Sequence, residues 1–339
     1  MGRYAAILAS VLVTAAFGAG IAAADESAVI DGEINARVIS HFAVGSSQTE
    51  FGPLTFNGGL DMSSGLSHFG ALSSIRFTDG GTHFIGVADT GFWYRGVLER
   101  DAEGHPAGIG GFQMKPIPDT RGAYSNAKWE TDAEGIAVAP DGALTVSFER
   151  RHRVSTYSVP GEAFDPQYRG DLDFVVPARE LRSNRGFETI TYAPADGPLA
   201  GARVAITEKS IDKAGNIFAA VLEGPLKGVF KVARSDEFDI TDGDFLPDGD
   251  LLILERRFSM AESVSMRIRR IRGADIKPGA TVDGEVLLTA DLLYQIDNME
   301  GLDAWQNAAG ETFVSVISDD NHSLLQRNLY LEFRLDMAD

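Results

Sequence analysis

The sequence predicts an all-β propeller, and three observations support this fold class. A pattern of an acidic residue, an apolar strand and a second acidic residue returns along the chain. Its copies begin near residues 73, 134, 188, 242 and 300, at spacings of 61, 54, 54 and 58 residues. Each copy contains short apolar or alternating runs separated by turn residues, as β-strands do. Repeats of this length made of several short strands are typical of propeller blades.

The second copy shows the four strands of one predicted blade. Residues 135–139 form the first strand, and Asp141-Gly142 is a hairpin turn. The three further strands are expected at 143–148, 152–159 and 171–176. The fourth copy repeats this order, with strands at 245–246, 251–254, 265–271 and 285–288. Residues 251–254 are apolar on both faces, which is expected of a strand that lies between neighbouring blades.

The two ends of the folded chain are expected to close the ring. Residues 36–44 precede the first copy and are strand-like, and residues 328–335 follow the last copy. Pairing of these two segments would leave no open sheet edge. Five four-stranded blades are recognisable, and the sequence leaves open whether residues 30–66 form a sixth.

The first 24 residues have the pattern of a secretory signal peptide. Arg3 is followed by an apolar run rich in alanine and by Ala22-Ala23-Ala24, a small-residue cleavage pattern. We expect cleavage, a single propeller domain over 25–339, and a periplasmic or secreted location. The alternative is an uncleaved anchor, which the short run rich in small residues disfavours.

The charge of the chain favours cations as ligands. The sequence has 30 Lys+Arg and 49 Asp+Glu, which gives a net charge of −19, and removal of Arg3 with the leader makes it −20. Such a chain repels nucleic acid and anionic membranes, so neither is expected as a partner, and no later segment is expected to span a membrane. Because there is no cysteine, an exported form would depend on its core and on any bound metal.

The repeated acids are expected to meet at one mouth of the central channel. In each copy the first acid begins the first strand and the second acid ends the second strand, so hairpin pairing places both at one edge. The first strands of propeller blades line the channel. The expected inner set is Glu134, Glu188, Asp242 and Glu300. The expected outer set is Asp89, Glu149, Glu208, Glu255, Asp319 and Asp320.

So many carboxylates cannot all stay ionised without a cation, because like charges raise one another's pKa. Oxygen-only sites prefer hard cations, so calcium is the expected cofactor, with another divalent ion as the alternative. The first copy departs from the pattern, since Ser73-Ser74 stands where an acidic residue is expected. This blade is either the open, substrate side of the ring or a degenerate copy.

Basic residues follow several of the second acids. We expect Arg150, Lys209 and Arg256 to contact an anionic substrate, and His322 or His68 to carry protons. The alternative for each basic residue is that it neutralises the acid beside it. For His68 the alternative is a purely structural role.

Several motifs resemble one known family. They are Phe69–Ile75, Arg185–Ile190, Leu252–Phe258, Asp297–Leu302 and Ser318–Asn321. Together they resemble the phytase-like family labelled "esterase-like activity of phytase", and the resemblance covers residues 38–335. It implies a β-propeller and hydrolysis of phosphate or carboxylate esters, and bacterial members are typically exported. No catalytic set is carried over from the family.

The sequence therefore predicts an exported, calcium-dependent ester hydrolase that acts on a small anionic ester, with phosphoesters expected first. One alternative is a non-catalytic module of the cell envelope that calcium stabilises and that binds a protein partner. Another is a sugar hydrolase of the lactonase type. An open metal position beside basic groups would favour an enzyme, whereas an ion saturated by protein ligands would favour a structural role.

Overall fold

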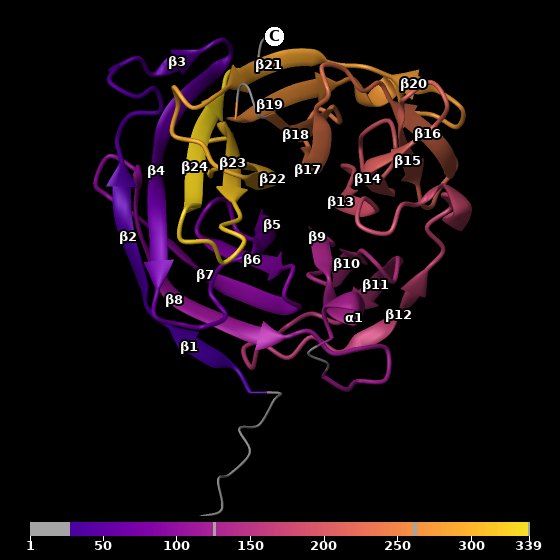
Figure 1. Cartoon of the computed structure of the whole chain (residues 1–339), viewed down its shortest axis with the longest axis horizontal. Coiled ribbons are helices and arrows are strands. Elements are labelled where there is room, and N and C mark those ends of the chain that lie inside the picture. The colour runs from indigo at the N-terminus through magenta and orange to yellow at the C-terminus, as the bar shows by residue number, and fades with distance from the viewer. Residues whose placement is uncertain (1–27, 125–126, 260–262, 338–339) are drawn as a thin grey trace, which may run out of the picture.

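The computed structural model describes residues 28–124, 127–259 and 263–337, and these form a five-bladed β-propeller (Figure 1). The predicted leader, residues 1–24, lies outside the described residues. The innermost strands of the blades contact one another in cyclic order. They are β5 (Leu72–Phe77), β9 (Ala133–Val138), β13 (Phe187–Tyr192), β17 (Asp239–Phe245) and β22 (Met299–Gln306). This confirms the predicted fold class.

The first three blades run outward from the axis in chain order. Blade 1 continues from β5 with β6 (His83–Ala88), β7 (Phe92–Arg100) and β8 (Pro106–Pro116), and β1 (Ile30–Gly32) is added outside. Blade 2 continues from β9 with β10 (Leu144–Phe148), β11 (Arg153–Tyr157) and β12 (Tyr168–Leu172). Blade 3 continues from β13 with β14 (Arg203–Ile211), β15 (Ile217–Val221), β16 (Gly228–Val232) and the short parallel strand β20 (Thr281–Val282).

Blade 4 follows the same order and blade 5 joins the two ends of the chain. Blade 4 contains β17, β18 (Leu251–Ser259), β19 (Ser263–Ile271) and β21 (Glu285–Ala290). Blade 5 contains β22, β23 (Thr312–Ser318), β24 (Asn328–Leu335), β4 (Leu54–Ser64) and β2 (Ile34–Ile39), and β3 (Glu50–Phe51) pairs with β4.

Closure by strands from both ends is confirmed, but the closing N-terminal strand differs from the predicted one. β4 pairs antiparallel with β24, whereas β2 pairs with the outer side of β4. β4 is buried along most of its length, while alternate residues of β2 are exposed. An inner position requires apolar side chains on both faces, and β4 meets this requirement better than β2. The segment 30–66 therefore supplies outer strands and not a sixth blade.

Apolar layers between the blades form the core. In β18, Leu251 and Ile253 belong to the cluster shared with blade 3, and Leu252 and Leu254 belong to the cluster shared with blade 5. All four are fully buried. The continuous apolar run at 251–254 therefore has the physical cause that the sequence predicted, because both faces of this strand meet a neighbouring blade.

An ion pair fills the channel between the inner strands. The Arg76 guanidinium on β5 lies 2.9 Å from Asp242 Oδ2 on β17 and donates hydrogen bonds to the carbonyls of Leu302 and Gly243. Both side chains are buried. This pair ties three inner strands together.

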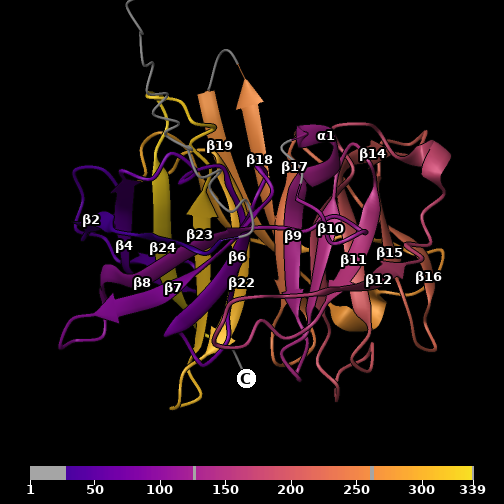
Figure 2. The same cartoon turned by 90° about the horizontal axis from the view of Figure 1, so that it is seen from below.

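One face of the ring carries α1 (Lys128–Thr131) and the tips of β18 and β19, which extend beyond the other strands (Figure 2). The described C-terminal end lies on the opposite face (Figure 2). Within the described ranges, the structure contains no helix with the length and apolar character needed to cross a membrane.

Candidate metal centre

A β-bulge at the start of each inner strand sets the positions of the acids. At the bulge, one residue of the inner strand has no partner on the second strand. The unpaired residues are Glu134, Glu188 and Glu300 in blades 2, 3 and 5, Ser73 in blade 1 and Thr241 in blade 4. Bulges bend the strand and re-aim a side chain, and they are frequent beside active sites. We call these five positions the inner ring.

The second strand supplies a matching position in every blade. In four blades the residue at this position donates a hydrogen bond from its backbone N–H. The acceptor is the carbonyl oxygen of the residue that lies two positions before the bulge residue, at 2.8–3.0 Å. In blade 4 the equivalent pairing joins Asp239 and Arg256. We call these positions the outer ring, and they are Asp89, Glu149, Glu208, Arg256 and Asp319.

Three predicted ligands lie outside these rings: Asp320, which follows the outer-ring residue Asp319, and Asp242 and Glu255, whose placement the structure corrects. Asp242 follows the bulge residue Thr241 and turns into the channel toward Arg76. Glu255 precedes Arg256 and turns into blade 4, where its oxygens lie 2.6 Å from the guanidinium nitrogens of Arg267 and Arg269. A shift of one residue moves a strand side chain to the opposite face. The sequence aligned both residues one position away from their structural equivalents.

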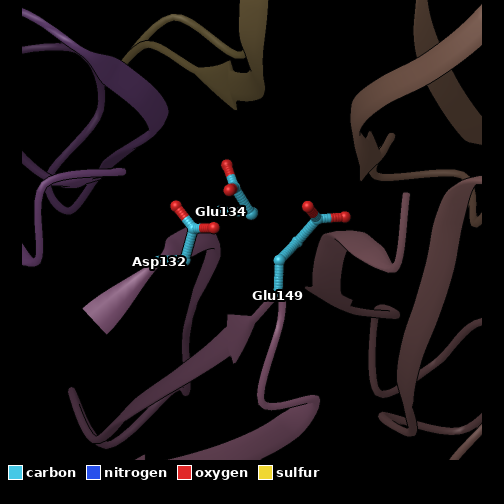
Figure 3. A group of neighbouring side chains, drawn as sticks. All are labelled: Asp132, Glu134 and Glu149. Carbon is cyan, nitrogen blue, oxygen red and sulfur yellow. The ribbon is translucent and has the colours of Figure 1, made fainter. Parts of the chain in front are cut away.

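Three carboxylates on blade 2 form the tightest group at the mouth. Asp132, Glu134 and Glu149 each offer an oxygen within 4.8 Å of the others. Figure 3 shows the three side chains pointing into the central opening, and we call them the acidic triad. Asp132 and Glu149 are 3% and 4% exposed, respectively. Asp132 was not among the predicted ligands, although it lies two residues before a repeated acid.

The surroundings of the triad fit a bound cation. Asp132 Oδ1 is buried and has no hydrogen-bond partner among the described residues. Lys128 Nζ and Arg150 Nε lie 3.5 and 2.5 Å from oxygens of Asp132. Within the part of the chain that the structure describes, no ion pair reaches Glu134 or Glu149. Asp132 therefore already has two basic partners, one of them 3.5 Å from Oδ1, whereas Glu134 and Glu149 have none. Carboxylate oxygens that lack such a partner are suitable ligands for a hard cation such as calcium.

Backbone packing fixes the orientation of Glu149. Its Oε1 accepts a hydrogen bond from the backbone N–H of Gly186 on the neighbouring blade. A Cβ at position 186 would lie 2.5 Å from His152 Nδ1. Only glycine therefore allows this backbone to approach both side chains.

Burial raises the pKa of several acids in both rings. Burial and the charge of Glu208 raise the pKa of Glu149 to about 8, against the hydrogen bond from Gly186. Burial, together with the charge of Glu149, raises the pKa of Glu134 and of Glu188 well above the usual range. Burial and the charge of Glu300 raise the pKa of Asp319 to about 8. Without a cation, these carboxyls hold protons at neutral pH.

Arg256 neutralises the opposite part of the mouth. Its guanidinium contacts Glu300 and Asn298 and lies 3.5 Å from Glu208 Oε1. Burial still raises the pKa of Glu300 to about 7, although Arg256 opposes this rise. The mouth is therefore divided between the triad, where Glu134 and Glu149 have no basic partner, and a side where Arg256 pairs with both Glu208 and Glu300.

The other predicted residues lie around this mouth in different roles. Asp320 accepts hydrogen bonds from the backbone N–H groups of Ala71 and His322 and from Asn328 Nδ2, so it orders a loop. Asp89 pairs with Lys128. The imidazole of His322 is exposed, and the exposed ring of His68 stacks on a phenylalanine ring with centroids 4.6 Å apart.

A cleft with a volume of about 910 Å³ opens beside Arg256. Glu208, Lys209, Arg185 and Asn298 also line it. Lys209 Nζ lies 2.7 Å from Asp239 Oδ2, so this lysine pairs with an acid of the cleft wall. The cleft gives a ligand access to the neutralised side of the mouth.

The fold and this site define a five-bladed propeller with a mouth rich in carboxylates. The family described as "Phytase-like: Esterase-like activity of phytase" matches residues 67–322, and the chain belongs to it. This confirms the resemblance noted in the sequence. No curated protein matches the chain.

Solved structures of low sequence identity align with most of the chain. The PQQ-bound aldose sugar dehydrogenase from Streptomyces coelicolor aligns with a TM-score of 0.46 and 12% identity, over 81% of this chain and 98% of that chain. A catalytically inactive variant of virginiamycin B lyase from Staphylococcus aureus, solved with quinupristin, aligns with a TM-score of 0.38 and 9% identity, over 91% of this chain and 90% of that chain.

Proposed function

We propose that this protein is an exported, calcium-dependent hydrolase of small anionic esters, with phosphoesters as the preferred class. The observation that carries the proposal is the divided mouth. Three converging carboxylates without a basic partner on Glu134 or Glu149 lie next to a cleft that carries Arg256, Arg185 and Lys209. Family membership supports ester hydrolysis as the reaction class. Export rests on the leader pattern of residues 1–24.

The chain's own residues have separate tasks in this proposal. The acidic triad holds the cation, which when bound polarises the ester and offsets the charge of the carboxylates. Arg256 and Lys209 orient the anionic group in the cleft. Glu300, with a pKa of about 7, is suited to exchange a proton near neutral pH. Hydrolysis adds one water across the ester bond and releases an alcohol and an acid.

Proton transfer by His322 or His68 and substrate contact by Arg150 remain predictions from the sequence. Arg150 lies against Asp132, so its substitution acts on the triad as well as on any bound anion. Comparison of Arg150→Lys with Arg150→Gln separates the two effects, because lysine keeps the positive charge but loses the guanidinium geometry.

A panel of phosphate and carboxylate esters tests the proposed activity, with purified protein in calcium and in chelator. We expect phosphoester turnover that requires calcium and that falls by about 100-fold in Glu134→Gln. The matched control is Glu285→Gln, an exposed glutamate on the outer strand β21, which should keep full activity. Absence of turnover, or turnover that chelator does not change, would remove the proposal. Retained calcium binding without turnover would leave the calcium-stabilised binding module as the function.

A further inference from the structure

The cleft beside Arg256 has one apolar wall that solvent reaches. Phe258, Leu292 and Leu325 line it, and they are 68%, 58% and 93% exposed, respectively. They come from three separate segments, namely strand β18, the loop after β21 and the loop between β23 and β24. Phe258 pairs across the hairpin with Val264, which lines the same cleft. Single exposed apolar side chains are ordinary, but several that line one cleft indicate a binding surface.

Another part of the lining concentrates positive charge around a single carboxylate. Lys209, Arg234 and Arg185 approach the single carboxylate of Asp239, at 2.7, 2.7 and 3.7 Å. The whole lining has four basic and four acidic residues, because Arg256, Glu208, Glu237 and Asp297 also belong to it. The positive charge is nevertheless concentrated around Asp239, where three of the four basic residues meet one carboxylate. This part of the lining therefore suits an anionic group with an unpaired negative charge.

Both parts of the lining belong to the cleft that reaches Glu208 and Arg256 at the mouth. A ligand that spans it meets positive charge in one part and apolar side chains in the other. Small sugars and free inorganic phosphate would leave the apolar wall in water. An amphiphile with an anionic head and an alkyl chain would cover both parts.

We infer that the substrate is an amphiphilic anionic ester, whose alkyl or acyl chain lies along Phe258, Leu292 and Leu325 while its charged head faces Arg256 and Lys209. This inference rests on the proposed hydrolase and specifies its substrate class. Burial of each additional methylene group on the apolar wall should tighten binding by about two- to fourfold.

The test uses the full chain and two series from butyl to octyl, below the micelle-forming concentration. The n-alkyl phosphates report kcat/KM, and the non-hydrolysable n-alkyl phosphonates report Kd by calorimetry. We expect both quantities to improve steadily with chain length. In the Phe258→Ser/Leu325→Ser variant the dependence on chain length should flatten, with a larger loss for octyl than for butyl compounds. Val38→Ser, a matched change at an exposed valine on β2, should keep the wild-type dependence.

The outcomes separate this inference from the proposed function. Phosphonate binding that strengthens with chain length without any turnover supports the amphiphile cleft and removes the hydrolase. Turnover with equal constants for butyl and octyl phosphate keeps the hydrolase and overturns the inference. Binding to neutral phosphatidylcholine vesicles that the double variant loses, without chain-length dependence for soluble compounds, would show a membrane-contacting surface and also overturn it.

Discussion

Replacement of Glu149 by glutamine should change stability in opposite directions with and without calcium. In the calcium-free protein, Glu149 is buried beside other acids, and burial with the charge of Glu208 raises its pKa to about 8. Glutamine keeps an oxygen that can accept the hydrogen bond from Gly186, but it carries no charge at any pH. The variant should therefore be more stable than the wild type at pH 8 in chelator and gain less stability from calcium.

The size of the effect follows from the pKa rise and from the spacing of the triad. A rise from 4.5 to about 8, at about 1.4 kcal/mol per pKa unit, corresponds to about 5 kcal/mol of folding free energy lost at pH 8. Two ionised oxygens no more than 4.8 Å apart repel by at least about 3 kcal/mol at an effective dielectric constant of 20. Local relaxation reduces both figures, so we expect a gain of about 2–4 kcal/mol for Glu149→Gln.

The sign of the pH dependence is fixed by linkage. Between pH 4.5 and 8 the folded wild type keeps a proton on Glu149 that the unfolded chain has lost, so its stability falls as pH rises. The variant lacks this loss, and the difference between the two proteins should disappear below about pH 4.5.

Thermal unfolding at pH 4.5 and pH 8, in chelator and in excess calcium, measures the stability of each protein and its gain from calcium at both pH values. Calcium at 100 times its Kd should stabilise the wild type by about 2.7 kcal/mol, and the variant by less than about half of this, because one of three charged ligands is lost. Glu285→Gln is the matched control and should follow the wild type. A calcium-free Glu149→Gln protein that is less stable than the wild type at pH 8, or an undiminished calcium shift, would refute the reasoning.

Three further predictions concern the same mouth and the channel below it. Calcium binding at pH 7 should release about one or two protons, because burial raises the pKa of the ligand Glu134 well above its usual range and that of Glu149 to about 8; binding enthalpies that are equal in buffers of different ionisation enthalpy would contradict this. Arg256→Met should destabilise the calcium-free protein by about 2–4 kcal/mol at pH 8. The loss of stability should be smaller at pH 5, where Glu300 (pKa about 7) is already protonated. Chemical denaturation at both pH values measures the two losses, and equal losses would contradict this prediction. Asp242→Asn should lower the free energy of unfolding by about 3–5 kcal/mol, because Arg76 loses its buried partner. The rise in Tm that calcium causes should persist in this variant, and its loss would show that Asp242 takes part in calcium binding.

The repeat spacing and the strand patterns were sufficient to predict the propeller. Residues 251–254 show why, since their side chains are apolar on both faces and pack on both neighbouring blades. The closing strand was harder to predict, because residues 36–44 and 54–64 are both strand-like. Their difference lies in how completely the finished ring buries them, and this depends on contacts with residues roughly 270 positions away.

The candidate site was predicted in outline but not in register. Glu134, Glu188 and Glu300 occupy equivalent bulge positions, as their shared spacing indicated. In blade 4, Thr241-Asp242-Gly243 imitates the acidic pattern, yet the bulge residue is Thr241. A bulge adds one unpaired residue, and local sequence does not show on which side of an acid it falls.

The proposed function depends most on a cation held by Asp132, Glu134 and Glu149. Diffraction from calcium-loaded crystals, with anomalous differences recorded, tests this directly. We predict one strong anomalous peak that oxygens of these three residues coordinate, and we predict its loss in Glu134→Gln crystals. A mouth without any peak at saturating calcium, or a peak that none of these three residues coordinates, would contradict the proposed site.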